Sequence, residues 1–202
     1  QAEQLLADMR FAACKIGLLG NSEIAECVHR LILRLEGIPI VLDPILRAGT
    51  GTAVADTALF EVIRDQLLPN STVITPNLAE ARQLSGCESG AEAAEKLLAL
   101  GAKNVLATGA DEDTASVINT LYQSHGAQTV YEYQRLAGAY HGSGCTLAAS
   151  LAANLALGFN MEEAARRAQD FTWRALAGGR QLGHGQLHPD RMQAAVGVTG
   201  AR

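Results

Sequence analysis

The sequence is poor in several features that mark particular classes of protein. Only 4% of its 202 residues are aromatic and 18% are charged, and Lys and Arg nowhere form a run. With a formal net charge of −5, the chain lacks the basic patch by which proteins bind nucleic acid. No apolar stretch is long enough to span a bilayer, and Gln1–Asp8 is typical of an amphipathic helix end and not of a signal peptide. We therefore expect a cytoplasmic protein that binds neither nucleic acid nor a membrane.

Cysteine pairs and the common nucleotide-binding motifs are also missing. The four cysteines are scattered and form no CxxC pair, which argues against a disulfide framework or a zinc site. Cys14 and Cys27 lie in apolar patterns, as small buried residues do. The sequence contains no GxxxxGK[ST], and no GxGxxG follows the first predicted strand. A P-loop NTPase and a dinucleotide-dependent dehydrogenase are both poorly supported.

Short apolar runs alternate with amphipathic segments along the first half of the chain. Buried strands are predicted at Phe11–Leu19, Pro39–Leu42, Thr72–Ile74 and Val105–Ala107. Helices are predicted between them at residues 21–35, 56–68, 79–84 and 91–100, with a Gly/Thr/Ala loop at 48–53. This alternation predicts an α/β fold, a doubly wound, mostly parallel sheet with helices on both faces.

The pattern changes after Thr108-Gly109. Residues 116–122 and 129–133 predict a β-hairpin, because a short segment containing Gly126 separates them. Helices are then predicted at residues 146–157, ended by Gly158, and at 161–176. We expect the glycine-rich tail, residues 178–202, to be loosely ordered. No repeat or linker divides the chain, so residues 1–202 are expected to form one domain.

The residues directly after the strands are the candidates for chemistry, because ligands of open α/β sheets bind outside the carboxyl ends of the strands. The most informative are Gly142, Ser143, Gly144 and Cys145, which precede a predicted helix of small residues. Successive backbone N–H groups and the helix N-terminus can surround an anion there, and glycines allow its close approach. The same field is expected to lower the pKa of Cys145. A simple tight turn is an equally good interpretation of this motif taken alone.

Two further positions carry carboxylates or amides. Asp43 follows a predicted strand and precedes a proline, so it either faces the ligand edge or bonds within its own turn. Asn77 and Glu80 are one helical turn apart at a predicted helix start. They either form a capping box or hold the water ligands of Mg²⁺. An anion site together with these groups favours a nucleotide bound with magnesium.

Several segments of the sequence resemble a known family, the hydroxymethylpyrimidine/phosphomethylpyrimidine kinases. The matching segments are KIGLLG (Lys15–Gly20), VLDPIL (Val41–Leu46), LLPNSTVITPNLAEARQLSG (Leu67–Gly86), GAKNVLATG (Gly101–Gly109) and HGSGCTLAASLAANLALG (His141–Gly158). The resemblance extends from about Gln1 to Leu176. In ribokinase-like sugar kinases the position of Cys145 is typically Asp, so the cysteine points to the pyrimidine kinases or to some pyridoxal kinases.

The resemblance implies a ribokinase-like fold and two successive ATP·Mg²⁺-dependent phosphorylations of the aminopyrimidine precursor of thiamine. Gly142, Ser143 and Gly144 would form the anion hole, and Cys145 would be the base for the substrate hydroxyl. The resemblance assigns Mg²⁺ and the triphosphate to Asp43, Asn77 and Glu80, the nucleotide to Thr108 and Gly109, and the pyrimidine to Leu18. It also implies a homodimer.

The sequence departs from the family in two places. The family usually has a Lys-Gly-Gly turn where this chain has Ala107-Thr108-Gly109-Ala110, so one nucleotide contact does not carry over. The sequence also opens in what resembles the middle of a βα unit, and we expect the domain to be incomplete at its N-terminus. Two other functions stay open: pyridoxal kinase activity, and a non-catalytic kinase-like module that binds a pyrimidine.

Overall fold

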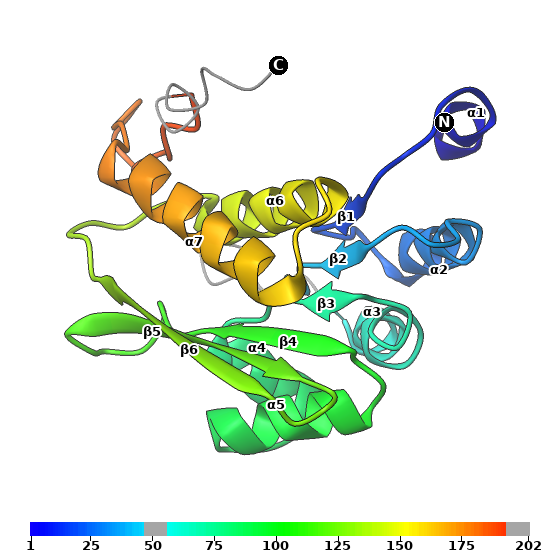
Figure 1. The fold of residues 1–202 in the computed structure, drawn as a ribbon, viewed down its shortest axis with the longest axis horizontal. Helices are drawn as coiled ribbons and strands as arrows, with labels where there is room; N and C mark the ends of the chain where they lie inside the picture. The colour runs from blue at the N-terminus through cyan, green and yellow to red at the C-terminus, as the bar shows by residue number, and fades with distance from the viewer. Residues whose placement is uncertain (47–55, 193–202) are drawn as a thin grey trace.

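A computed structural model describes residues 1–46 and 56–192 of the chain, and Figure 1 shows the arrangement of its elements. In chain order these are α1 (Ala2–Asp8), β1 (Cys14–Ile16), α2 (Ser22–Ile32), β2 (Ile40–Leu42), α3 (Thr57–Val62), the π-helix η1 (Ile63–Leu67), β3 (Val73–Ile74), α4 (Leu78–Ser85), α5 (Gly90–Ala99), β4 (Asn104–Thr108), β5 (Ser116–Gln123), β6 (Gln128–Gln134), α6 (Ser143–Ala156) and α7 (Met161–Ala177). The loop predicted at 48–53 lies outside the described residues. Across the two described ranges, no helix combines the length and the apolar character that a membrane crossing needs.

The strands form one sheet in the order β1-β2-β3-β4-β5-β6. Strands β1 to β4 are parallel, and β5 and β6 are the antiparallel hairpin predicted from the sequence. The predicted mostly parallel α/β sheet is therefore confirmed. The strand predicted at Phe11–Leu19 is too long, because β1 pairs with β2 only from Cys14 to Ile16.

Helices cover both faces of the sheet (Figure 1), and the strand order explains which helices share a face. The strand order proceeds in one direction from β1 to β4, and right-handed crossovers in one direction place all their helices on the same face. Helices α2, α3, α4 and α5 accordingly share one apolar core with the sheet, whereas α6 and α7 form a second core on the opposite face. The pleat divides β2 between these cores: Ile40 and Leu42 join the first, and Val41 joins the second.

Side-chain caps set several helix boundaries. Asn21 Oδ1 accepts a hydrogen bond from the N–H of Ile24 (2.9 Å), and Asp56 Oδ1 accepts one from Leu59 (2.8 Å). Helix α2 ends at Ile32, three residues before the predicted end. The larger difference is at α6, which begins at Ser143, so the motif predicted to precede this helix forms its first turn.

The segment after α7 folds back onto the protein. Arg180 and His188 form a β-bridge, and Leu187 exchanges backbone hydrogen bonds with Ala139 (2.8 Å) and His141 (2.9 Å). The backbone N–H of Asp190 donates to Ala175 (2.8 Å). The tail expected to be loosely ordered is thus hydrogen-bonded to the body of the protein at Leu187 and Asp190, while residues 193–202 lie outside the described part.

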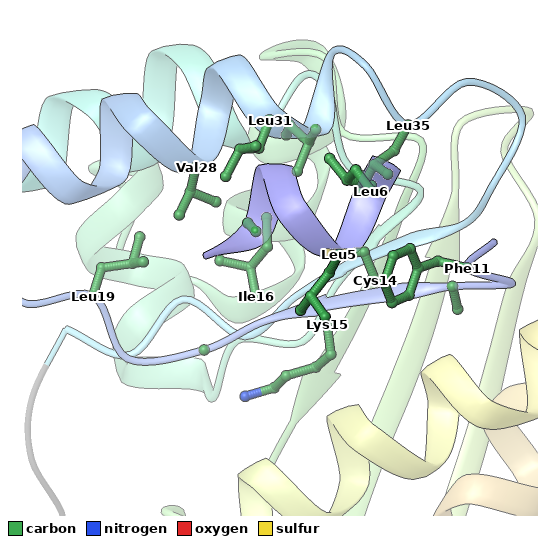
Figure 2. Close-up of a pocket in the computed structure, with 14 residues that line it drawn as sticks. Leu5, Leu6, Phe11, Cys14, Lys15, Ile16, Leu19, Val28, Leu31 and Leu35 are labelled. Atoms are coloured by element: carbon green, nitrogen blue, oxygen red, sulfur yellow. The ribbon is translucent and has the colours of Figure 1, made fainter. Parts of the chain in front are cut away.

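An apolar groove of about 450 Å³ runs along the edge strand β1. Side chains of α1, β1 and α2 line it, among them Leu5, Ile16 and Leu31. Figure 2 shows the Lys15 side chain leaving β1 on the side opposite to α2, so its charged end points away from these apolar groups. The groove and the polar end of Lys15 therefore belong to different surfaces.

Candidate active site

The carboxyl ends of the parallel strands meet at one edge of the sheet. Backbone hydrogen bonds connect the residues that follow neighbouring strands: the N–H of Asp43 donates to Ile16 (2.9 Å), that of Thr75 to Leu42 (2.9 Å), and that of Thr108 to Pro76 (3.0 Å). The loops predicted as candidates are thereby brought together in space.

A buried ion pair lies at this edge. Asp43 is 5% exposed, and its Oδ2 lies 3.0 Å from the Lys15 Nζ. A side chain at Gly17 would collide with Nζ, so the glycine leaves room for the ion pair. Asp43 also faces α6, because a Cβ placed on Gly144 would lie 4.0 Å from Asp43 Oδ1. The structure therefore favours the interpretation in which the Asp43 side chain faces the ligand-binding edge of the sheet.

Lys15 was missed as a candidate. It precedes the end of β1, so counting the residues after each strand passes over it. The available signal is a charged residue inside an otherwise apolar run, KIGLL, where a buried partner is needed.

The first turn of α6 offers backbone donors to a ligand. Gly142 is the N-cap residue and has φ +85°, a left-handed conformation that favours glycine. Since glycine has no side chain, no side-chain cap occupies the N–H groups at the start of the helix. Together with the positive end of the helix dipole, these N–H groups suit a phosphate.

Cys145 lies in this first turn, as predicted, but the expected direction of its pKa is wrong. The residue is exposed at the protein surface, yet the surrounding protein removes part of the solvent around its thiol, and this desolvation raises the pKa. The Asp43 carboxylate raises it further, while the charges of Lys15 and Arg191 oppose the shift. Desolvation first and the nearby carboxylate second thus set the direction of the shift, and the prediction from the helix field included neither.

Asn77 and Glu80 form the capping box that was one of their two interpretations. The Asn77 side chain accepts a hydrogen bond from the N–H of Glu80 (2.8 Å), and Glu80 Oε2 accepts one from the N–H of Asn77 (3.0 Å). Glu80 also accepts a backbone hydrogen bond from Leu46 and so joins the loop after β2 to the start of α4. Burial raises the pKa of Glu80 to about 7, and the charge of Asp43 contributes to this shift.

This pKa predicts a pH-dependent stability. Because the pKa of Glu80 is about 7 in the folded state against an ordinary 4.5, the folded state holds the proton where the unfolded state has lost it. The contribution is complete below about pH 4.5 and is lost as the pH rises through about 7. Between pH 5 and pH 8, the free energy of unfolding in urea should fall by about 1–3 kcal/mol more for the wild type than for Glu80→Gln. A difference between the two proteins that is constant over this range would contradict the assignment.

Thr108 and Gly109 lie beside the capping box. Thr108 forms a β-bridge with Asn77, and the N–H of Gly109 donates to Asn119 Oδ1 (3.0 Å). Gly109 is packed so closely that a Cβ would collide with the carbonyl oxygen of Ile118. Both residues are thus held at the sheet edge where the nucleotide was predicted.

The loop after Gly109 is fixed by Arg135, a residue that sequence reasoning did not select. The guanidinium donates to the carbonyl oxygens of Thr114 (2.7 Å), Ala110 (3.0 Å) and Glu112 (2.7 Å). Within this loop, Asp111 accepts a hydrogen bond from the N–H of Ala79 at the start of α4 (3.1 Å). Arg135 therefore orders the backbone that follows the predicted nucleotide contact.

Leu18 lies on the loop after β1 and is 59% exposed. It is absent from the described residues that line the apolar groove, although its neighbours Gly17 and Leu19 contribute to that lining. Its predicted contact with a pyrimidine stays a prediction.

At this edge of the sheet, a buried carboxylate lies opposite a helix start that can hold a phosphate. This arrangement is typical of an α/β phosphotransferase. The family described as phosphomethylpyrimidine kinase matches residues 1–190 of the chain. The chain belongs to this family, and it is a kinase.

Individual relatives agree with this assignment. The chain is 37% identical over 193 residues to a hydroxymethylpyrimidine/phosphomethylpyrimidine kinase of Synechococcus elongatus, covering 92% of this chain and 73% of the relative. Its fold is similar to that of a pyridoxal kinase of Bacillus subtilis in complex with ADP, with a TM-score of 0.87, 29% identity, and 98% and 76% of the two chains covered. It is also similar to a phosphomethylpyrimidine kinase of Clostridium difficile, with a TM-score of 0.75, 25% identity, and 87% and 73% covered. The ribokinase-like fold expected from the resemblance is confirmed.

Proposed function

We propose that this protein phosphorylates hydroxymethylpyrimidine and then its monophosphate with ATP, as a kinase of thiamine biosynthesis. The observation that carries the proposal is the start of α6, where uncapped N–H groups and Cys145 lie opposite the buried Asp43. Donors fixed in place before the reaction can stabilise the charge of a transferring phosphoryl group without reorganising.

The resemblance and this geometry suggest a role for each residue. Gly142, Ser143 and Gly144 bind the transferring phosphoryl group through their backbone, and Cys145 accepts the proton of the substrate hydroxyl. Because its pKa is raised, little thiolate is present at neutral pH. Only this thiolate fraction can accept the proton, so the rate of transfer should depend on pH. The hydroxyl oxygen bonds to the γ-phosphorus, the bond from that phosphorus to the bridging oxygen breaks, and ADP leaves.

The residues at the sheet edge fit Mg²⁺. Asp43 and Glu80 supply carboxylates, and the buried Thr75 Oγ1 has no hydrogen-bond partner among residues 1–46 and 56–192. Those ranges contain no group of three or more His, Cys, Asp or Glu residues suited to a metal, but Mg²⁺ commonly uses one or two carboxylates with waters and phosphates. We assign Asp43 and Glu80 to Mg²⁺, which would neutralise phosphate charge when bound. Asn77, Thr108 and Gly109 are assigned to the nucleotide and Leu18 to the pyrimidine.

Pyridoxal kinase activity is a second candidate, because solved pyridoxal kinases of Bacillus subtilis and Staphylococcus aureus are among the structural neighbours. ADP release measured with each substrate separates the two functions. We expect hydroxymethylpyrimidine to support turnover with a kcat/KM at least 10-fold above that for pyridoxal. Turnover with pyridoxal alone would replace the proposed substrate. ATP binding without turnover of either would favour a non-catalytic module.

We further propose that residues 1–202 form a single cytoplasmic domain that assembles as a homodimer. The match of one family to residues 1–190 supports the single domain. The dimer rests on the family resemblance, and light scattering of the purified protein would test it directly.

A further inference from the structure

The backbone after α7 carries an arginine to the start of α6. Two contacts fix this path. One is the bridge between Arg180 and His188, and the other is the hydrogen bond from the Asp190 N–H to the carbonyl oxygen of Ala175 (2.8 Å). The next residue is Arg191, whose side chain is 45 positions from its partner Thr146 in the sequence. The position of Arg191 is thus set by backbone hydrogen bonds and not by its side chain alone.

The Arg191 guanidinium lies against the first turn of α6. Its Nε donates to Thr146 Oγ1 (3.0 Å), and Thr146 Oγ1 donates in turn to the carbonyl oxygen of Gly142 (2.7 Å). A Cβ placed on Gly142 would lie 3.0 Å from Arg191 Nη2. Nη2 therefore reaches the same glycine that leaves the helix N–H groups uncapped.

The positively charged residues near this turn differ in whether they already form an ion pair. Lys15 forms the ion pair with Asp43 (3.0 Å), and Arg180 forms one with Asp190 (2.9 Å). Arg191 forms no ion pair with any residue of the described ranges, and it is exposed to solvent. Of the cations that act on Cys145, Arg191 is thus the one available to a dissolved anion.

We propose that Arg191 binds the γ-phosphoryl group of ATP together with the backbone N–H groups of the first turn of α6. This inference rests on the proposed function, because it assumes that the nucleotide's terminal phosphate lies at this helix start. Arginine suits such a position: Nε is held by Thr146, the Nη groups donate to no residue within 1–46 and 56–192, and a planar guanidinium can bind phosphate oxygens in pairs. The charge at the tip of the triphosphate then meets a full positive charge as well as the helix dipole.

The test compares two nucleotides by titration calorimetry in wild-type protein, Arg191→Ala and Arg191→Lys. One is ADP and the other is the non-hydrolysable analogue β,γ-methylene-ATP, both with Mg²⁺. We expect Arg191→Ala to weaken binding of the analogue about 10- to 100-fold and to leave ADP binding within about 2-fold. Arg191→Lys should recover part of the loss. Arg10→Ala removes one exposed positive charge elsewhere and should leave both affinities unchanged.

Each outcome decides the proposal. Unchanged binding of the analogue in Arg191→Ala would overturn the proposal, and so would an equal loss for ADP. Either result would mean that Arg191 does not contact the γ-phosphate. Arg191→Lys guards against a folding defect, because it keeps the charge and most of the side chain. The measurement needs no turnover, so a protein that binds the analogue but phosphorylates no pyrimidine would contradict the proposed function and still test Arg191.

Discussion

Replacing Cys145 with alanine should lower kcat by about 10²- to 10⁴-fold, the range that a positioned general base contributes. The KM for ATP should change little, because the proposed phosphate contacts at this helix start come from backbone N–H groups and Arg191 and not from the thiol. Steady-state ADP release with hydroxymethylpyrimidine measures both constants. Cys27→Ala is the matched control, since Cys27 is an exposed cysteine on α2 whose thiol contacts Arg30 of the same helix.

The pH dependence distinguishes a base from a merely well-packed residue. Because the pKa of Cys145 is raised above its ordinary value of 9.0, the wild-type kcat should still increase with pH between 7 and 9. In Cys145→Asp the base is ionised throughout this range, and kcat should be nearly independent of pH. If wild type and Cys145→Asp share one pH profile, the proton is accepted elsewhere and the role assigned to Cys145 is wrong.

Much of the fold follows from local patterns in the sequence. The apolar runs before Asp43 and Thr75 and the alternating hairpin segments have short-range signatures, and each was predicted at about its observed place. The capping box at Asn77 and Glu80 is also local, since it requires two residue types three positions apart. Predictions were least accurate at the ends of elements, as at β1, where pairing with β2 sets the length.

The site was less predictable, because its chemistry depends on residues far apart in the chain. Desolvation raises the pKa of Cys145, and Asp43, about one hundred positions away, raises it further; a single-helix argument includes neither effect. Lys15 pairs with Asp43 across two strands, and Arg191 reaches Thr146 through the segment expected to be loose. Each of these partners becomes visible only when the sheet edge is assembled.

The ion pair of Asp43 and Lys15 allows stability and activity to be separated. Asp43→Asn leaves the Lys15 charge at a mostly buried site without its partner, so unfolding in urea should show a loss of about 2–4 kcal/mol. The same change removes a proposed Mg²⁺ ligand and should lower kcat/KM by at least about 10²-fold. Lys15→Met combined with Asp43→Asn removes both charges at nearly constant volume.

The double variant should be within about 1 kcal/mol of the wild type in stability, because replacing a buried pair by groups of similar size is often neutral. Its activity should stay as low as that of Asp43→Asn, since restoring the packing does not restore a carboxylate at the phosphate site. If activity returned together with stability, Asp43 would act only through Lys15 as a structural residue. The proposed magnesium site would then lack its buried carboxylate, and Glu80 alone would remain to hold the metal.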